Sequence, residues 1–287
     1  MIEVGKVNNL HVDRKSDIGY ILTNIQNEEV VLFFNDATKT IEIGDNVDAF
    51  IFLDAYQRKC ATLQIPYLKL DEEGILKVVS IKEGLGVFLD NGIRKHLLLS
   101  YEDLPLNKDI LPQINDEVLV VLKLKNNLIA KPVIRPRNLP LNDLKINDEV
   151  EAVVTKVAQE GILAVSYDFH YIFIYKTYIR SSYRVGQVIK VKIINAKEDS
   201  TYNGSLIEQK ENQLFVDSNM ILSYLLKNDG VLNLDSESSS EEVFNIFKIS
   251  RKSFKRALGH LYKERRITFN NNKTILVSKE LINKEVL

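Results

Sequence analysis

The chain has 287 residues, enough for several domains, and its 45% hydrophobic and 27% charged residues are typical of an ordinary soluble protein. A single cysteine, Cys60, excludes an intramolecular disulfide framework and a cysteine-cluster zinc site. The net charge of −1 says nothing about partners until it is divided along the chain. No segment reaches the roughly 18 apolar residues of a membrane span, and the N-terminus lacks the apolar core of a signal peptide. We therefore expect a cytoplasmic protein with no membrane partner.

A repeat occupies the first two-thirds of the chain. The turn-forming stretches IGDNV, INDEV and, more loosely, VGQV begin at positions 43, 114 and 185, which are 71 residues apart each time. Each opens an alternation of apolar and polar residues, the side-chain period of a strand. Upstream of the three stretches, apolar segments begin at Gly19, Gly86 and Gly161. Short strands bounded by turns, with little helical periodicity, predict three small β-barrels, because closure removes exposed strand edges.

The domain boundaries follow from this repeat. We place three barrels at residues 1–65, 66–135 and 145–212, and a C-terminal domain at 213–287. Each upstream glycine is expected to permit a bend or a close backbone approach at a barrel corner. The connector PVIRPRNLPLND contains three prolines, which predicts a semi-rigid spacer. Its Arg135 and Arg137 either contact phosphate or keep the spacer solvated.

The second unit contains KVVSIKEGLGVFLD (77–90) followed by GIRKHLLLSYEDLP (92–105). These segments resemble the S1 RNA-binding domain, a five-stranded OB-fold barrel. In that family a G-x-F motif on the second strand places its Phe toward RNA, so the resemblance implies Phe88 as an RNA contact. The histidine that usually lies on the third strand is absent, because that stretch reads Leu97–Leu99. The first and third units carry Ile21 and Leu163 in place of the motif's Phe. Whether the first two barrels bind RNA therefore stays open.

An aromatic row marks the third unit, in SYDFHYIFIYKTYIR (166–180). Tyr171, Phe173 and Tyr175 alternate with two isoleucines, which predicts one strand. Small barrels favour branched aliphatic residues inside, so we expect the isoleucines to point inward and the rings outward. The outward rings either stack on bases or pack against a neighbouring domain.

Residues on both sides of this strand complete a candidate groove. Asp168 is expected in the turn before the strand, which leaves Tyr167 and Phe169 at its entrance and off the shared face. The cations expected near the rings are Lys176, Arg180 and Arg184, with Lys190 and Lys192 as weaker candidates. His170 either stacks on or hydrogen-bonds to bases, or has no part in binding.

From about residue 215 the hydrophobic period becomes helical. The predicted elements are helices at 219–227, 238–248 and 249–266, a short strand or turn at 230–236, and a hairpin at 267–277 with an Asn-rich turn. Asp217 or Ser218 is expected to cap the first helix, and Ser250 the third. This order resembles a winged-helix domain.

The third predicted helix concentrates positive charge. Residues 244–266 contain eight Lys or Arg and one Glu. Its expected apolar stripe is Phe254, Ala257, Leu258 and Leu261. The candidate nucleic-acid contacts are Arg251, Lys252, Lys255, Arg256, Lys263, Arg265 and Arg266. The alternative is a solvated helix face, but Gly259 on the cationic side would let a phosphate backbone approach closely.

Candidate chemistries other than binding have little support. Neither a P-loop nor a dinucleotide-binding glycine motif occurs, and neither a metal-ligand set nor an acid–base pair is recognisable. Cys60 lies in a predicted strand and is expected to be a small core residue. We therefore expect no enzyme activity, no catalytic residue, no cofactor and no metal. The predicted fold class is mainly β with a small α+β C-terminal domain.

Three S1-like barrels followed by a winged helix cover nearly the whole chain. That order resembles the conserved virulence factor B (YitL-like) family. The resemblance implies a non-catalytic cytoplasmic regulator that binds RNA and influences gene expression, including virulence functions. We expect single-stranded RNA as partner, bound by stacking and phosphate contacts without strict sequence readout, and duplex DNA or RNA as a second partner of the winged helix. The alternatives are a DNA-binding regulator whose barrels bind proteins, and an adaptor for ribosome or ribonuclease assemblies.

Overall fold

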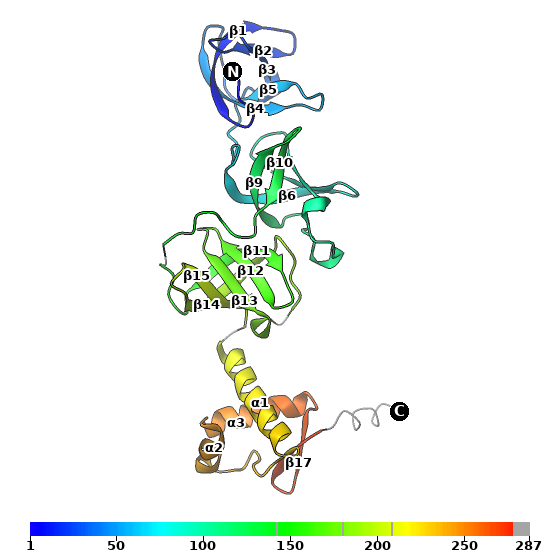
Figure 1. Cartoon of the computed structure of the whole chain (residues 1–287), viewed down its shortest axis with the longest axis vertical. Coiled ribbons are helices and arrows are strands. Elements are labelled where there is room, and N and C mark those ends of the chain that lie inside the picture. Colours follow the sequence, from blue (N-terminus) through cyan, green and yellow to red (C-terminus); the bar gives the residue numbers. More distant parts are fainter. Residues whose placement is uncertain (142, 180, 208, 278–287) are drawn as a thin grey trace. The chain divides into compact units, whose positions relative to one another are not determined.

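The computed structural model describes residues 1–141, 143–179, 181–207 and 209–277. The chain divides into two compact units, Met1–Leu206 and Ile207–Leu287. The first unit consists of three closed β-barrels in succession, and the second combines helices with a small sheet (Figure 1). This arrangement confirms the predicted fold class.

Each barrel has five strands in the described part of the chain. The first contains β1 (Val7–Lys15), β2 (Gly19–Thr23), β3 (Glu29–Phe33), β4 (Asn46–Leu53) and β5 (Lys59–Thr62). The second contains β6 (Glu73–Lys82), β7 (Gly86–Leu89), β8 (Leu97–Ser100), β9 (Glu117–Leu124) and β10 (Leu128–Pro132). The third contains β11 (Glu149–Val157), β12 (Gly161–Ser166), β13 (Tyr171–Tyr175), β14 (Val188–Ala196) and β15 (Thr201–Ser205).

The strand order is the same in all three barrels. Within each barrel the strands follow the order first, second, third, fifth, fourth, and the fourth pairs with the first to close the sheet. The third and fifth strands are parallel and every other pair is antiparallel. A 3-10 helix follows the third strand each time, at Phe34–Asp36, Tyr101–Asp103 and Lys176–Tyr178. This is the five-stranded topology of an OB-fold.

The glycine that begins the second strand has a steric role in every barrel. A Cβ on Gly19, Gly86 or Gly161 would lie 2.1, 2.2 or 2.1 Å from a backbone carbonyl oxygen of the neighbouring strand. The second and third of these glycines also have φ of +151° and +156°, which side-chain-bearing residues rarely adopt. The close backbone approach expected from the sequence is confirmed.

We predict that Gly161→Ala destabilises the protein by about 3 kcal/mol, because the new methyl group would overlap the carbonyl oxygen of Ile174. Urea denaturation followed by circular dichroism measures the change. Gly259→Ala is the matched control, since a Cβ there meets nothing within 4 Å and removing glycine from a helix interior stabilises by about 1 kcal/mol. Equal midpoints for Gly161→Ala and the unmodified chain would contradict the steric role.

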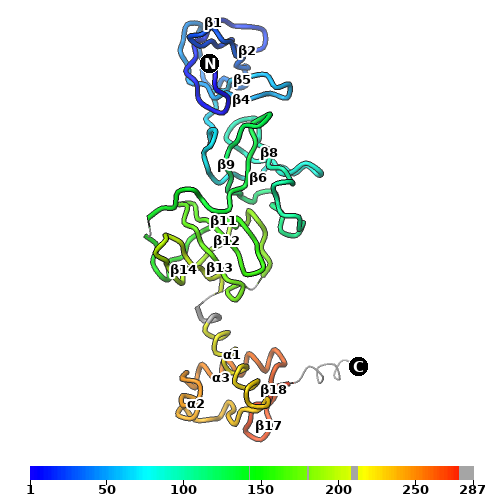
Figure 2. Tube along the Cα trace, in the orientation of Figure 1, coloured from blue at the N-terminus to red at the C-terminus, as the bar shows by residue number. Residues whose placement is uncertain are grey.

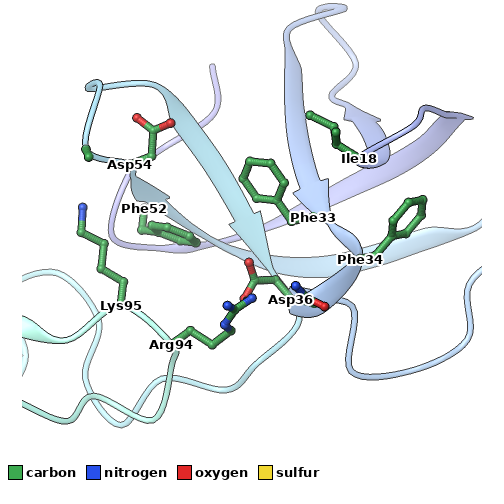
Figure 3. A pocket seen from close by; sticks show the side chains of 10 residues that line it. Ile18, Phe33, Phe34, Asp36, Phe52, Asp54, Arg94 and Lys95 are labelled. Carbon is green, nitrogen blue, oxygen red and sulfur yellow. The ribbon is translucent and has the colours of Figure 1, made fainter.

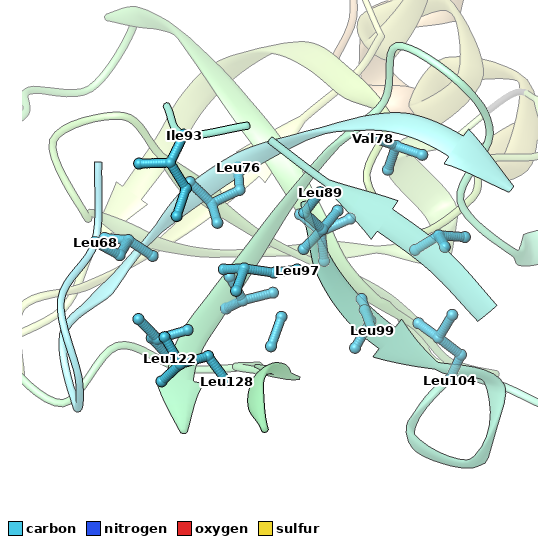
Figure 4. Packing of buried hydrophobic residues seen from close by; sticks show 14 of the residues in the cluster. Leu68, Leu76, Val78, Leu89, Ile93, Leu97, Leu99, Leu104, Leu122 and Leu128 are labelled. Atoms are coloured by element: carbon cyan, nitrogen blue, oxygen red, sulfur yellow. The ribbon is translucent and has the colours of Figure 1, made fainter. Parts of the chain in front are cut away.

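The alternating residues of the strands build a separate core in each barrel. In the second barrel the core is almost entirely leucine and valine, with Leu89, Leu99 and Leu122 fully buried (Figure 4). Phe50 of the first barrel also packs into this cluster, and the Leu70 N–H donates to the carbonyl oxygen of Gly5 at 2.8 Å. The first and second barrels therefore share buried apolar contacts.

The second and third barrels are joined by polar contacts and by the connector between them. The Glu117 N–H donates to the Gly186 carbonyl oxygen at 2.8 Å. In the connector, Arg137 Nε lies 2.9 Å from Glu73 Oε1, and the Thr155 hydroxyl of β11 donates to the carbonyl oxygen of Ile134 at 2.9 Å. The connector, green in Figure 2, therefore runs in contact with both barrels.

The second unit is built from three helices and a three-stranded sheet in its described residues. They are α1 (Gln209–Lys227), α2 (Ser240–Phe247), α3 (Arg251–Lys263), β16 (Val231–Leu232), β17 (Ile267–Asn270) and β18 (Lys273–Leu276). The sheet order is β16-β18-β17, and the turn of the β17–β18 hairpin is Asn271-Asn272, both with positive φ. A single apolar cluster between the helices and the sheet forms the core. The predicted winged-helix order is confirmed.

The start predicted for the first helix of this unit was wrong. α1 begins at Gln209, ten residues before the predicted position 219, and Asp217 and Ser218 lie inside it. Both side chains are buried, and the Asp217 carboxylate accepts a hydrogen bond from Gln213 Nε2 at 2.7 Å, one turn earlier. Asp217 and Ser218, although residues of a type that often caps helices, are therefore buried interior residues of this helix.

Candidate nucleic-acid interface

The outward rings of β13 lie on one face of the third barrel. Ile172 and Ile174 are fully buried, and the rings of Tyr171, Phe173 and Tyr175 alternate with them on the outside, as predicted. The ring centroids of Phe173 and Tyr175 are 4.6 Å apart at 86°, and Tyr175 is 44% exposed. These two rings form an edge-to-face pair that presents aromatic surface to solvent.

Tyr171 differs from the other two because the connector covers it. The guanidinium carbon of Arg135 lies 5.3 Å from the centroid of the Tyr171 ring, a cation–π contact. Burial of the phenol raises the pKa of Tyr171. Neither role considered for Arg135, phosphate contact or simple solvation, describes this contact. The candidate stacking surface therefore consists of the exposed Tyr175 ring and the half-buried Phe173 ring, with Tyr171 beside them under Arg135.

The two earlier rings stand apart from this surface, as the predicted turn at Asp168 requires. Phe169 lies in the β12–β13 turn with φ of +67°. The Tyr167 hydroxyl donates to Glu117 Oε2 of the second barrel at 2.7 Å, and burial together with this bond raises the pKa of Tyr167 to about 12. Tyr167 therefore contributes to the joint between barrels.

The predicted cations around the rings occupy different environments. Lys176 is exposed and follows Tyr175 directly, at the start of the 3-10 helix. Lys190 forms an exposed ion pair, with its Nζ 2.6 Å from Glu149 Oε2. Arg180 lies outside the described residues. Lys176 is thus the predicted cation that stands next to the ring pair.

Arg184 does not serve as the free phosphate-binding cation that was predicted. Its Nε lies 2.7 Å from Asp116 Oδ2 and its terminal nitrogen 2.8 Å from Asp116 Oδ1, a two-pronged ion pair between the second and third barrels. The Asp116 side chain is only 7% exposed, and its carboxylate raises the pKa of Arg184. The donors that would meet a phosphate are used in the barrel joint.

We predict that Arg184→Gln lowers the stability of the first unit by about 1–2 kcal/mol and leaves RNA affinity within two-fold of the unmodified chain. The loss reflects two charge-assisted hydrogen bonds to a buried carboxylate. Thermal unfolding and RNA titration of the same preparation measure both quantities. A large loss of RNA affinity at unchanged stability would contradict this prediction and would indicate that Arg184 contacts RNA.

His170 is a structural residue. Its ring is 3% exposed, with Nδ1 2.9 Å from the hydroxyl of Ser166 and Nε2 2.7 Å from Asp143 Oδ1 in the connector. This serine–histidine–aspartate set has the composition of a hydrolase triad, but Ser166 is 2% exposed and its hydroxyl accepts the backbone N–H of His170. A buried hydroxyl held in this way fixes the turn and the connector. Of the two alternatives considered for His170, the buried and fully partnered ring favours the one in which it has no part in binding.

Phe88 lies on the equivalent surface of the second barrel. It is half-buried on β7 and pairs across the sheet with Leu98 on β8, the strand on which S1 domains usually carry a histidine that this chain lacks. Its cross-strand partner is thus a leucine, as is Leu163 opposite Phe173 in the third barrel.

In the second unit, α3 presents two different faces. Ser250 caps the helix by accepting the N–H of Ser253 at 3.1 Å, and the predicted stripe of Phe254, Ala257, Leu258 and Leu261 is buried. The opposite side carries the exposed cations Lys252, Arg256 and Lys263, which form no ion pair with the side chains of residues 213–277. α3 is therefore an amphipathic helix with a buried apolar face and an exposed cationic face, as the sequence predicts.

The remaining predicted cations of this unit differ in availability. Glu237 holds two of them, with Lys255 Nζ at 3.2 Å from Oε1 and Arg251 at 3.8 Å from Oε2. Arg265 and Arg266 are exposed just beyond the end of α3. Gly259 is exposed on the cationic side with open space around it.

One aromatic pair in this unit was missed by sequence reasoning. The rings of Tyr262 and Phe269 stack with centroids 5.4 Å apart at 29°, and both are exposed. They come from α3 and β17, and Tyr262 directly precedes Lys263 in the chain. The sequence feature that could have indicated this pair is Tyr262, an aromatic residue among the cations at the end of α3.

The comparisons with known proteins agree with these domains. Family models match as an S1 domain at residues 4–64, a CvfB first S1-like domain at 74–129 and a CvfB-like winged helix domain at 219–276. A solved structure of a multidomain protein with nucleic acid binding domains from Streptococcus pneumoniae TIGR4 has the same fold, with a TM-score of 0.58 and 24% identity, over 96% of this chain and 98% of that one. The chain therefore contains two S1-type barrels, a third barrel with the same strand order, and a winged helix. S1 and winged-helix domains are both nucleic-acid-binding domain types.

Two full-length relatives define the family. YitL of Bacillus subtilis (strain 168) is 32% identical over 92% of this chain and 91% of its own length. Conserved virulence factor B of Staphylococcus saprophyticus (strain ATCC 15305) is 30% identical over 96% and 95%. The chain belongs to the conserved virulence factor B family. No helix in the described ranges is long and apolar enough to cross a membrane.

Proposed function

We propose that this protein binds single-stranded RNA, performs no catalysis itself, and acts in the cytoplasm as a post-transcriptional regulator of gene expression. The observation that carries the proposal is the Phe173–Tyr175 ring pair on the outside of the third barrel, with Tyr175 exposed and Phe173 half-buried, followed directly by Lys176. Flat aromatic surface next to a cation suits an unpaired base and its phosphate. A duplex keeps its bases stacked inside, so such a surface favours single strands.

The mechanism is stacking combined with phosphate neutralisation. Each base stacked on a ring contributes about 1–3 kcal/mol, and every base has a π-face, so binding tolerates sequence variation. The exposed cations of α3 supply phosphate contacts on the winged helix. Because cation–phosphate contacts release counterions, affinity falls as salt concentration rises.

A DNA-binding regulator is the second candidate function. It is favoured by one observation, the exposed Lys252, Arg256 and Lys263 on the third helix of a winged-helix domain. In helix-turn-helix proteins the corresponding helix enters the major groove of duplex DNA. In this account the barrels would bind proteins.

Competition between ligands separates the two candidates. A labelled single-stranded RNA of about 20 nucleotides is bound to the full chain, and unlabelled RNA or duplex DNA of equal length and charge is added at several salt concentrations. Single-stranded RNA should compete at least ten-fold better than duplex DNA. Better competition by the duplex would favour the DNA-binding regulator, and no binding to either would favour an adaptor that recognises protein.

The regulatory role rests on the family. Relatives across most of the chain carry the name conserved virulence factor B. A non-catalytic RNA-binding protein influences expression by changing which RNA segments are accessible to translation or decay. Sequencing of RNAs recovered with the protein from cells, compared with a strain lacking it, tests this role: the bound transcripts should be those whose abundance or translation changes.

A further inference from the structure

A pocket of about 700 Å³ lies where the first barrel meets a loop of the second (Figure 3). The first barrel contributes the β1–β2 turn, the end of β3 with its 3-10 helix, and the end of β4 with the turn that follows. The β7–β8 loop of the second barrel contributes Arg94 and Lys95. The site therefore requires both barrels.

The walls of this pocket are aromatic. Phe33 and Phe52 are half-buried, and their rings border the same space in Figure 3, with Phe34 on the other side of the β3 end. Phe34 is supported from outside by the Tyr20 ring, with centroids 5.5 Å apart, and by Lys15 Nζ at 5.4 Å. Phe33 occupies the position of Tyr175 in the third barrel, since each residue directly precedes the 3-10 helix after the third strand. An aromatic ring at this place thus occurs in two barrels.

Two cations stand at the side formed by the second barrel. Lys95 Nζ donates to the carbonyl oxygen of Leu53 and to Asn127 Oδ1, and burial lowers the pKa of its ammonium group. Within the described residues these acceptors leave one of its three N–H donors available. Arg94 is 56% exposed and 3.9 Å from Asp36 Oδ1, beyond hydrogen-bond distance, so its donors can meet an anion.

The two acids of the pocket are in different states. The Asp54 carboxylate is held by Arg58, whose terminal nitrogen lies 2.7 Å away, and by two backbone N–H groups, so it is neutralised within its own turn. Asp36 is 6% exposed, and burial raises the pKa of its carboxyl. No hydrogen bond to its carboxylate oxygens occurs among the described residues. Asp36 is therefore an acceptor at the pocket that lacks a donor.

We propose that this pocket binds one nucleotide whose base carries an exocyclic amino group. The base stacks against Phe33 and Phe52, the amino group donates to Asp36, and the phosphate meets Arg94 and Lys95. Cytosine, adenine and guanine have such an amino donor and uracil has none. The nucleotide is either free or part of a bound RNA. This pocket is separate from the β13 and α3 surfaces to which we assign RNA binding. Only the possibility that the nucleotide belongs to a bound RNA rests on the proposed function.

The test uses the full chain with two matched mononucleotides, cytidine and uridine 5′-monophosphate, titrated by calorimetry. The cytidine compound should bind at least five-fold more tightly than the uridine compound. Phe33→Leu keeps the apolar volume but removes the ring, and Arg94→Gln removes an exposed charge. Each should weaken cytidine monophosphate binding at least five-fold, as expected for a lost stacked base or phosphate contact. Unchanged melting temperatures check that both variants remain folded.

A ten-nucleotide oligocytidylate distinguishes the source of the nucleotide. If only the oligonucleotide binds and Phe33→Leu weakens it, the site takes nucleotides from RNA. If neither ligand responds to Phe33→Leu or Arg94→Gln while Tyr175→Ala weakens the oligonucleotide, the pocket proposal is overturned and the proposed function stands. If Phe33→Leu and Arg94→Gln weaken mononucleotide binding but Tyr175→Ala leaves oligonucleotide affinity unchanged, the proposed function fails and the pocket proposal stands. Absence of binding by any probe overturns both.

Discussion

Replacing Lys252, Arg256 and Lys263 together by Gln is expected to weaken binding of single-stranded RNA by about 10- to 100-fold at low salt. These side chains are exposed and form no ion pair with the side chains of residues 213–277, so their charge is available to phosphates. Each lost phosphate contact lowers the slope of log affinity against log salt by about 0.7 for single strands, so the triple variant should lose about 2. Titrations at four salt concentrations measure both values.

A charge-matched control separates this effect from a general change in charge. Lys6, Lys123 and Lys131 are at least partly exposed, and each already pairs with a carboxylate. Replacing these three by Gln gives the same change in net charge and should leave affinity within about three-fold. Equal losses from both triple variants would mean that α3 is only a solvated face.

Phe173→Ala combined with Tyr175→Ala is expected to weaken the binding free energy of RNA by about 2–6 kcal/mol, because two stacking surfaces are removed at about 1–3 kcal/mol each. The barrel should remain folded, since the buried contacts on this strand come from Ile172 and Ile174. Fluorescence anisotropy with labelled RNA measures the affinity, and thermal unfolding measures the stability.

Conservative replacements make the ring prediction specific. Tyr175→Phe retains the ring and should bind RNA within two-fold of the unmodified chain. Tyr171→Ala should cost less than either Phe173→Ala or Tyr175→Ala, because Arg135 covers the Tyr171 ring. A collapse of the barrel in the double variant would identify the rings as core. Unchanged affinity in a folded double variant would contradict a stacking role.

The barrels were predictable because their determinants are local. Alternating residues, a turn at a fixed distance and a glycine where two backbones approach can all be read within one 71-residue repeat. The α3 helix was predictable for the same reason, since its cap and apolar stripe lie within one element. The start of α1 was missed because Asp217 and Ser218 favour caps in isolation but are buried within the helix by tertiary packing.

Contacts between distant residues limited the prediction of the site. Arg184 and Asp116 are 68 positions apart, and no local pattern distinguishes a paired arginine from a free one. Arg135 reaches Tyr171 only because the connector folds back along the third barrel. The pocket at Phe33 combines residues of two barrels. The aromatic pair Phe33-Phe34 is visible in the sequence, but the cations Arg94 and Lys95 lie about 60 positions further on, so no local pattern connects them. Site residues on one element were therefore easier to identify than sites assembled from several.

Ultraviolet crosslinking of the full chain to a single-stranded RNA of mixed sequence, followed by mass spectrometry of the peptides, tests the central claim most directly. The account predicts crosslinked peptides that contain Phe173 and Tyr175 and peptides from α3, all reduced by excess unlabelled RNA. Crosslinks confined to other surfaces, with none at β13 or α3, would contradict it.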